Sequence, residues 1–121
     1  MTDIFKNVFN GVEKEFTHLE DLLYYDGPLL SLYTSNTSEK ALFLALELDY
    51  DKNQRWGIIL LTKEQEKDYF EAKEDLRTIM LSKDFLYTFE YNKDWNIVNF
   101  KEVKTSDFSE DDLPTKGLCN V

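Results

Sequence analysis

The alternation of apolar and polar residues in the middle of the chain predicts a β-hairpin. Residues 41–50 carry apolar side chains at every even position, whereas the odd positions are apolar only as far as Ala45 and are then acidic. This pattern is typical of a strand that buries one face completely and exposes the end of the other. Residues 56–61 form a second apolar run after the polar turn 51–54, so the two segments predict an antiparallel pair.

A second hairpin is predicted further along the chain. Aromatic side chains occupy every second position of residues 85–91, which indicates a strand with an aromatic face. The polar turn at 92–94 leads into a partner strand over 95–103. A short strand is also expected at 29–33, directly after Gly27-Pro28, because proline lacks a backbone donor and glycine permits a left-handed backbone.

Helical patterns occur at three places. Near the start of the chain, apolar residues recur at intervals of three and four, which predicts an amphipathic helix over residues 1–12. The residues that form this stripe are Ile4, Phe5, Val8, Phe9 and Val12. Capping-box patterns at 17–20 and 62–65 each predict the first turn of a helix, and a helical face over 76–80 continues the second one or follows it separately.

These elements together predict an α+β fold in a single domain, residues 1–121. We expect an antiparallel sheet of four to five strands, an N-terminal helix, and one or two helices inserted between two β-hairpins. Nine Phe, seven Tyr and two Trp supply enough apolar surface for one core in a chain of 121 residues. Residues 105–121 form an acidic C-terminal segment that we expect on the surface, with an end that frays.

The charge balance adds information about partners. The chain has 24 acidic and 14 basic residues and a net charge of −10. This charge disfavours direct binding to DNA or RNA, because a phosphate backbone would be repelled. It is compatible with simple solubility or with recognition of a protein partner that has a basic surface.

The sequence also predicts where the protein resides. Cys119 is the only cysteine, so an internal disulfide is excluded and a reducing compartment is favoured. Residues 1–6 lack the pattern of a signal peptide, and no apolar run is long enough to span a bilayer. We therefore expect a cytoplasmic protein, of a bacterium or of an infected host cell, with no membrane contact.

Candidate chemistry is sparse. His18 is the only histidine and is expected to be solvated at the start of a helix rather than to serve as a base. The segment beginning at Asp49 resembles a calcium loop, but Gln54 and Leu60 stand where glycine and a bidentate glutamate are required. The sequence thus predicts no catalytic residues, no cofactor and no metal site. Paired carboxylates in a cleft remain the one route to hydrolytic chemistry.

The residues that we expect to contact a partner are mainly acidic. They comprise a run near the C-terminus, two acids at a hairpin tip and one tryptophan: Asp107, Glu110, Asp111, Asp112, Asp49, Asp51 and Trp56. Such an acidic run is either a solvated tail or a surface that imitates nucleic-acid phosphates. Trp56 is an interface anchor or a core residue, and Arg55 is expected to pair with Asp26 or Asp49.

One family resemblance accompanies these patterns. The residues Tyr25-Asp26-Gly27-Pro28-Leu29-Leu30, the strand Leu42-Phe43-Leu44, the pair Arg55-Trp56, the pair Leu76-Arg77 and the late Leu113-Pro114 carry it. In this order they resemble a family of small bacterial and phage proteins that is known only as a domain of unknown function. The family pattern has an acidic residue directly after the Leu-Arg pair, and this chain has Thr78 there instead. The resemblance implies no activity and no catalytic residues.

Three functional hypotheses follow. The first is a non-enzymatic, acidic protein-binding module that acts stoichiometrically as an inhibitor of a basic partner, in the manner of antitoxin, immunity or phage counter-defence proteins, with nucleic-acid mimicry as one form of it. The second is an accessory subunit of a larger assembly or a homodimer, joined through residues 1–12. The third is a small carboxylate-dependent hydrolase, which requires two acids in one cleft.

Overall fold

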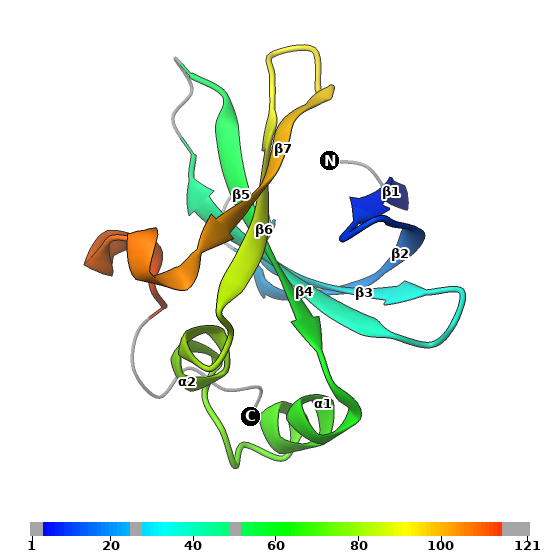
Figure 1. Cartoon of the computed structure of the whole chain (residues 1–121), viewed down its shortest axis with the longest axis vertical. Helices are drawn as coiled ribbons and strands as arrows, with labels where there is room; N and C mark the ends of the chain where they lie inside the picture. The colour runs from blue at the N-terminus through cyan, green and yellow to red at the C-terminus, as the bar shows by residue number, and fades with distance from the viewer. Residues whose placement is uncertain (1–3, 25–27, 49–51, 115–121) are drawn as a thin grey trace.

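The chain folds around one curled antiparallel sheet. The computed structural model describes residues 4–24, 28–48 and 52–114. Its strands are β1 (Ile4–Phe9), β2 (Val12–Tyr24), β3 (Pro28–Ser35), β4 (Lys40–Glu47), β5 (Gln54–Leu61), β6 (Phe85–Tyr91) and β7 (Ile97–Lys104). Each strand pairs with its neighbour in sequence, in the order β1 to β7, and the seven-stranded sheet bends into a half-barrel (Figure 1). The prediction of an α+β fold with four to five strands and an N-terminal helix is therefore wrong.

The predicted N-terminal helix is replaced by a β-hairpin. β1 and β2 pair from Ile4 opposite Thr17 to Phe9 opposite Val12, and a two-residue turn joins them. Asn10 and Gly11 have φ angles of 49° and 78° in this turn. Positive φ at both central residues is the requirement of a type I′ hairpin turn, and Asn-Gly is the pair that meets it best.

The second predicted helix, beginning at Thr17, is also a strand. β2 runs through this segment and pairs with β3, with register shifts between His18 and Glu20 and again near Leu23. Such irregularities are typical of β-bulges, which increase strand twist and bending. The bulged β2 thus helps the sheet to curl.

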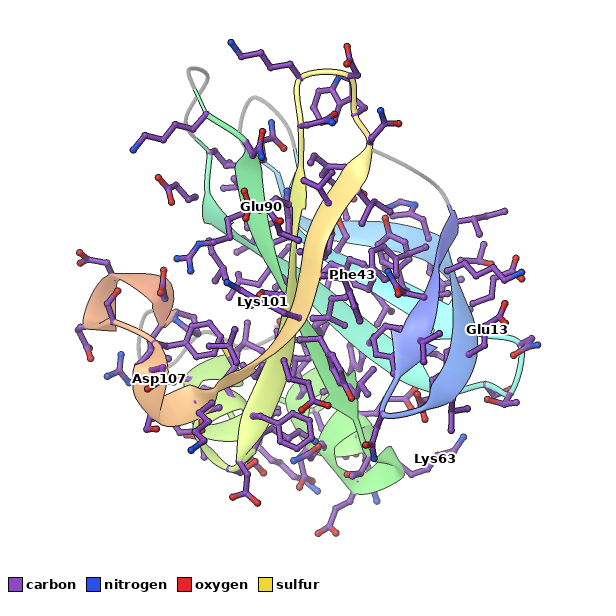
Figure 2. All side chains as sticks on the ribbon, turned by 45° about the horizontal axis from the view of Figure 1, so that its top comes forward. Glu13, Phe43, Lys63, Glu90, Lys101 and Asp107 are labelled. Carbon is purple, nitrogen blue, oxygen red and sulfur yellow. The ribbon has the colours of Figure 1, made fainter. Side chains whose placement is uncertain are left out.

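The concave side of the half-barrel holds an aromatic core. Phe5 of β1 contacts the rings of Phe43 and Phe89 at centroid distances of 5.2 and 4.7 Å. Phe43 lies centrally among these rings (Figure 2), and Phe100 of β7 approaches Phe9 to 5.2 Å. Side chains from the first and last strands therefore meet across the interior, which stabilises the curvature.

The opposite face of the sheet is covered by two short helices. α1 (Lys63–Phe70) begins at Thr62, where the capping box predicted from the sequence is formed with Gln65. α2 (Leu76–Leu81) begins after Asp75, whose side chain accepts a hydrogen bond from the Thr78 amide. Their apolar residues pack against leucines and isoleucines of β3, β4 and β5. Neither helix has the length and apolar character that crossing a membrane requires, and the same holds for every helix of the described residues.

Candidate functional site

The acidic segment after β7 is folded against the body of the protein. It forms two 3-10 turns, η1 (Thr105–Asp107) and η2 (Glu110–Asp112). The Thr105 hydroxyl donates to the carbonyl of Lys83 at 2.6 Å, and the side chains of Phe108 and Leu113 join the apolar core beneath the helices. The described part of the segment, 105–114, is therefore a defined surface. Residues 115–121 lie outside the described residues.

Two arginines hold this segment in place. Arg55 of β5 forms an ion pair with Asp112, and a longer one with Glu47 at 3.9 Å. Arg77 of α2 reaches both carboxylate oxygens of Glu110, at 2.6 and 2.8 Å. Both contacts join residues more than 30 positions apart, so they fix the acidic segment to the sheet and to α2. The sequence expectation for Arg55 had named Asp26 or Asp49, which both lie outside the described residues.

The structure places the predicted contact residues in different environments. Asp107, Glu110 and Asp111 are exposed, and Asp107 lies at the edge of the molecule (Figure 2). Asp112 has a side chain only 12% exposed and serves as an anchor.

The remaining predicted contact residues do not join this surface. Trp56 is 2% exposed and lies in the aromatic core, so its ring is not presented to a partner. Asp49 and Asp51 lie outside the described residues.

A groove of about 690 Å³ runs beside the acidic segment, between α2 and η2. Its walls include the acids Asp75 and Glu110, and its apolar lining includes Leu81 and Leu113. Leu81 is 51% exposed, which is high for a leucine. Exposed apolar surface rimmed by charge is the usual composition of a protein-binding surface. The groove and the acids together form our candidate site, which we call the acidic face: Asp107, Glu110, Asp111 and the groove at Leu81 and Leu113.

The acids of the groove already have structural roles. Asp75 caps α2, and Glu110 is paired with Arg77. A hydrolytic pair needs one carboxylate free to act as an acid and the other as a base or nucleophile. In the groove, Asp75 and Glu110 each already bind another group of the protein. Within the three described stretches of chain, no group of three or more His, Cys, Asp or Glu side chains is placed to hold a metal ion.

His18 belongs to a separate polar cluster with Asp21 and Ser31. Asp21 Oδ1 accepts from the Ser31 hydroxyl at 2.6 Å and lies 2.8 Å from His18 Nε2. A nucleophilic serine would need the histidine beside its own hydroxyl. Here the Ser31 hydroxyl and the His18 ring each contact the Asp21 carboxylate and not each other. Ser31 is also completely buried. The cluster therefore ties β2 to β3, and the expected solvated helix-start histidine is a half-buried strand residue.

This cluster predicts a pH-dependent contribution to stability. Burial would raise the pKa of Asp21, but hydrogen bonds from Ser31 and His18 outweigh burial and hold the pKa below its ordinary value of 3.8. The stabilisation of the fold by the charged Asp21 carboxylate is therefore complete above that value. It is lost as the pH falls through the pKa of Asp21 in the folded state. We expect Ser31→Ala to lower the free energy of unfolding by about 1 kcal/mol at neutral pH, as measured by urea denaturation.

The difference between wild type and Ser31→Ala should shrink below about pH 4, where the carboxylate becomes protonated. Ser109→Ala is the matched control, because Ser109 is exposed and its side chain makes no capping bond. A Ser31→Ala difference that stays constant through the acid range would show that the carboxylate contributes nothing through this contact.

Comparisons of the chain with family models, with curated proteins and with solved structures find no match. The resemblance to a family of unknown function remains a prediction over roughly residues 22–114, and Tyr25, Asp26 and Gly27 of its first motif lie outside the described part of the chain.

Proposed function

We propose that the protein is a non-enzymatic binding module that covers a basic surface of a protein partner with its acidic face. The observation that supports this most strongly is the anchoring of residues 105–114 by Arg55 and Arg77. An acidic tail in free motion would lose conformational entropy on binding, whereas a segment that is already folded avoids most of this cost.

The charge distribution supports the same face. Residues 105–114 contain four acids and no base, and the helical region 62–84 next to them contains seven acids and five bases. By contrast, residues 85–104, which include β6 and β7, have three acids and three bases. Of these three regions, the short segment 105–114 has the highest density of negative charge, which would steer a basic partner toward the groove beside it.

The mode of action that fits this surface is stoichiometric inhibition. The fixed carboxylates would occupy the basic groove of the partner in place of phosphates. An antitoxin, an immunity protein or a phage counter-defence protein would inhibit its partner in this way. Of the four acids in residues 105–114, Asp107 and Asp111 form no ion pair with a described residue, and Glu110 is paired but its side chain is 75% exposed. These three carboxylates form the charged part of the contact.

The test compares two variants of equal net charge as baits. The acidic-face variant carries Asp107→Asn, Glu110→Gln and Asp111→Asn. It leaves the Arg55–Asp112 anchor intact, and Glu110→Gln removes a charge but keeps an oxygen that accepts from Arg77. The control variant carries Glu15→Gln, Glu20→Gln and Asp94→Asn at exposed positions elsewhere. Proteins captured from a lysate of the source cells would be identified by mass spectrometry, and the affinity of each basic one measured.

We expect the acidic-face variant to bind a basic partner about tenfold more weakly, since three exposed ion pairs contribute up to about 0.5 kcal/mol each. The control variant should retain wild-type affinity. Equal weakening in both variants would show that net charge alone matters, and unchanged binding in both would exclude the acidic face as the contact surface.

A further inference from the structure

The concave side of the half-barrel contains a cavity at the end where the β1–β2 turn lies. Its volume of about 330 Å³ falls within the range of small-molecule sites. Phe9 of β1, Ile58 and Leu60 of β5, and Tyr87 of β6 line it with apolar surface. None of its lining residues belongs to the acidic segment 105–114, so the cavity is separate from the acidic face.

Lys83 lies at this cavity and is held there from several directions. It follows α2, and its backbone amide donates to the Met80 carbonyl at 3.2 Å. Its carbonyl accepts from the Thr105 hydroxyl, and its ammonium donates to Gln65 Oε1 at 2.8 Å. The backbone of Lys83 is therefore held at both its amide and its carbonyl, and its ammonium is held by Gln65.

The positive charge of Lys83 lacks a paired carboxylate within the described part of the chain. Its hydrogen-bond partner is a neutral amide, and the side chain is partly buried. Burial lowers the pKa of Lys83, and the more distant negative charge of Glu39 only opposes this effect. A half-desolvated ammonium beside an apolar cavity is costly unless something compensates it.

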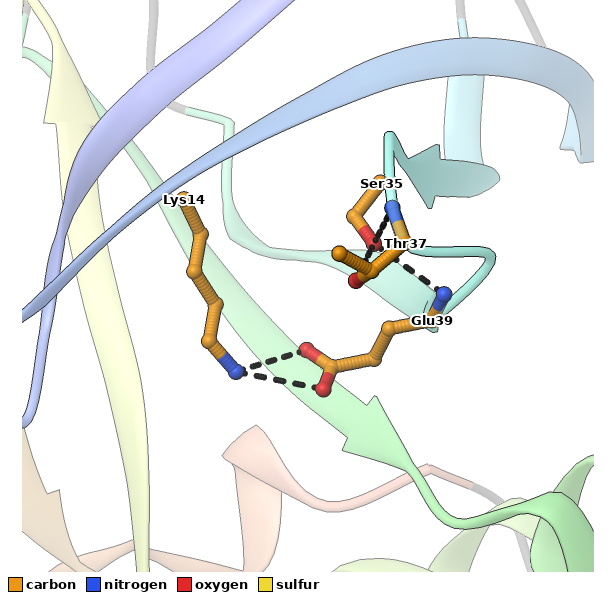
Figure 3. Close-up of polar contacts among 4 residues, drawn as sticks. All are labelled: Lys14, Ser35, Thr37 and Glu39. Carbon is orange, nitrogen blue, oxygen red and sulfur yellow. Dashed lines mark hydrogen bonds and ion pairs between the residues drawn. The ribbon is translucent and has the colours of Figure 1, made fainter.

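The charge of the neighbouring lysine, Lys14, is balanced by a carboxylate. Lys14 of β2 also lines the cavity, and its ammonium lies 2.9 and 3.1 Å from the two oxygens of Glu39 (Figure 3). The Glu39 backbone is fixed by the turn after β3, where Ser35 Oγ accepts from the amides of Thr37 and Glu39. The same end of the half-barrel thus holds one lysine with a carboxylate and one without.

We propose that the cavity binds an amphipathic anion, whose apolar body lies on Phe9, Ile58 and Leu60 and whose carboxylate pairs with Lys83. The chemical class is a medium-chain carboxylate or an aryl carboxylate. The lining contains two lysines and one acid, the exposed Asp84. Lys14 is paired with Glu39, so Lys83 is the lining cation without an ion pair to a described residue. A charge-assisted contact in such a partly desolvated place is stronger than one in water.

The test uses octanoate and its neutral analogue 1-octanol as probes. Binding would be measured by calorimetry and located by chemical-shift changes in isotope-labelled protein. We expect octanoate to bind with one-to-one stoichiometry about tenfold more tightly than 1-octanol, because only the anion satisfies Lys83. The largest shifts should fall on the residues that line the cavity, Leu60 and Leu86 among them.

Lys83→Met should remove the preference for octanoate while leaving 1-octanol binding unchanged, and Lys83→Arg should retain the preference. Lys101→Met is the matched control, because Lys101 is exposed on β7 (Figure 2) and does not line the cavity. Leu60→Trp should block both probes by filling the space. Equal affinity for the two probes, failure of octanoate to saturate, or full octanoate affinity in Lys83→Met would each overturn the proposal.

Discussion

Phe5→Ala is expected to lower the free energy of unfolding by about 3–5 kcal/mol, which is the largest effect of any single substitution considered for this protein. Phe5 is fully buried and its ring contacts four other aromatic rings from β1, β4, β6 and β7. Alanine would leave a cavity where the two ends of the sheet meet. Urea denaturation with a fluorescence readout measures the loss.

The matched control is the neighbouring residue on the same strand. Ile4 is 51% exposed, so Ile4→Ala should change the free energy of unfolding by no more than about 0.5 kcal/mol. An amphipathic helix over residues 1–12 would instead bury both side chains, and the two substitutions would then have similar costs. Comparable losses for Ile4→Ala and Phe5→Ala would thus contradict the hairpin.

The second large effect is expected from the anchor of the acidic segment. Asp112→Asn keeps the shape of the side chain but removes the charge that pairs with Arg55, and both partners are partly buried. Breaking such a contact leaves a guanidinium with only the distant Glu47, so we expect a loss of about 2 kcal/mol in the free energy of unfolding. Chemical denaturation gives this value.

The same substitution should loosen residues 105–114 selectively. Limited proteolysis is expected to cut this segment faster in Asp112→Asn than in wild type, while the sheet stays protected. Asp111→Asn removes an equal charge from an exposed neighbour and should change neither stability nor cleavage. If the two variants behave alike, the Arg55–Asp112 pair does not anchor the segment.

The N-terminal hairpin shows why part of the fold escaped prediction. Positions 5 and 9 are four residues apart, and this interval returns to the same face in both a helix and a strand. Only Ile4 and Val8 distinguish the two, and both are apolar yet exposed in the hairpin. The decisive local signal was Asn10-Gly11, the preferred pair of a two-residue hairpin turn, which outweighs a short apolar periodicity.

The two capping-box patterns show the limit of local signals. Thr62 begins a real helix because the residues that follow it are charged or amide helix formers with little strand propensity. The segment after Thr17 pairs along β3 instead, through His18, Glu20, Asp21 and Leu23, so tertiary contacts override the cap. The strands predicted at 41–50, 56–61 and 85–91 correspond to β4, β5 and β6, although β4 ends at Glu47, because their alternation is strongly apolar.

The candidate site was predictable only in its charges. The acidic run at 107–112 is visible in the sequence, but its anchors Arg55 and Arg77 lie 57 and 33 residues away from their partners, and no local pattern reports such pairs. The burial of Trp56 likewise depends on the curl of the sheet. Lys83 gave no signal at all, because its importance comes from a cavity that only the folded chain forms.

The most direct test of the proposed function is the salt dependence of partner affinity in wild type and in the acidic-face variant, between about 50 and about 300 mM salt, over which charge screening rises steeply. If the fixed carboxylates of the acidic face contact a basic partner, the affinity of the wild type falls steeply as the salt concentration rises. Asp107→Asn, Glu110→Gln and Asp111→Asn together should make this dependence of affinity on salt less steep. Identical slopes for the two proteins would contradict the account.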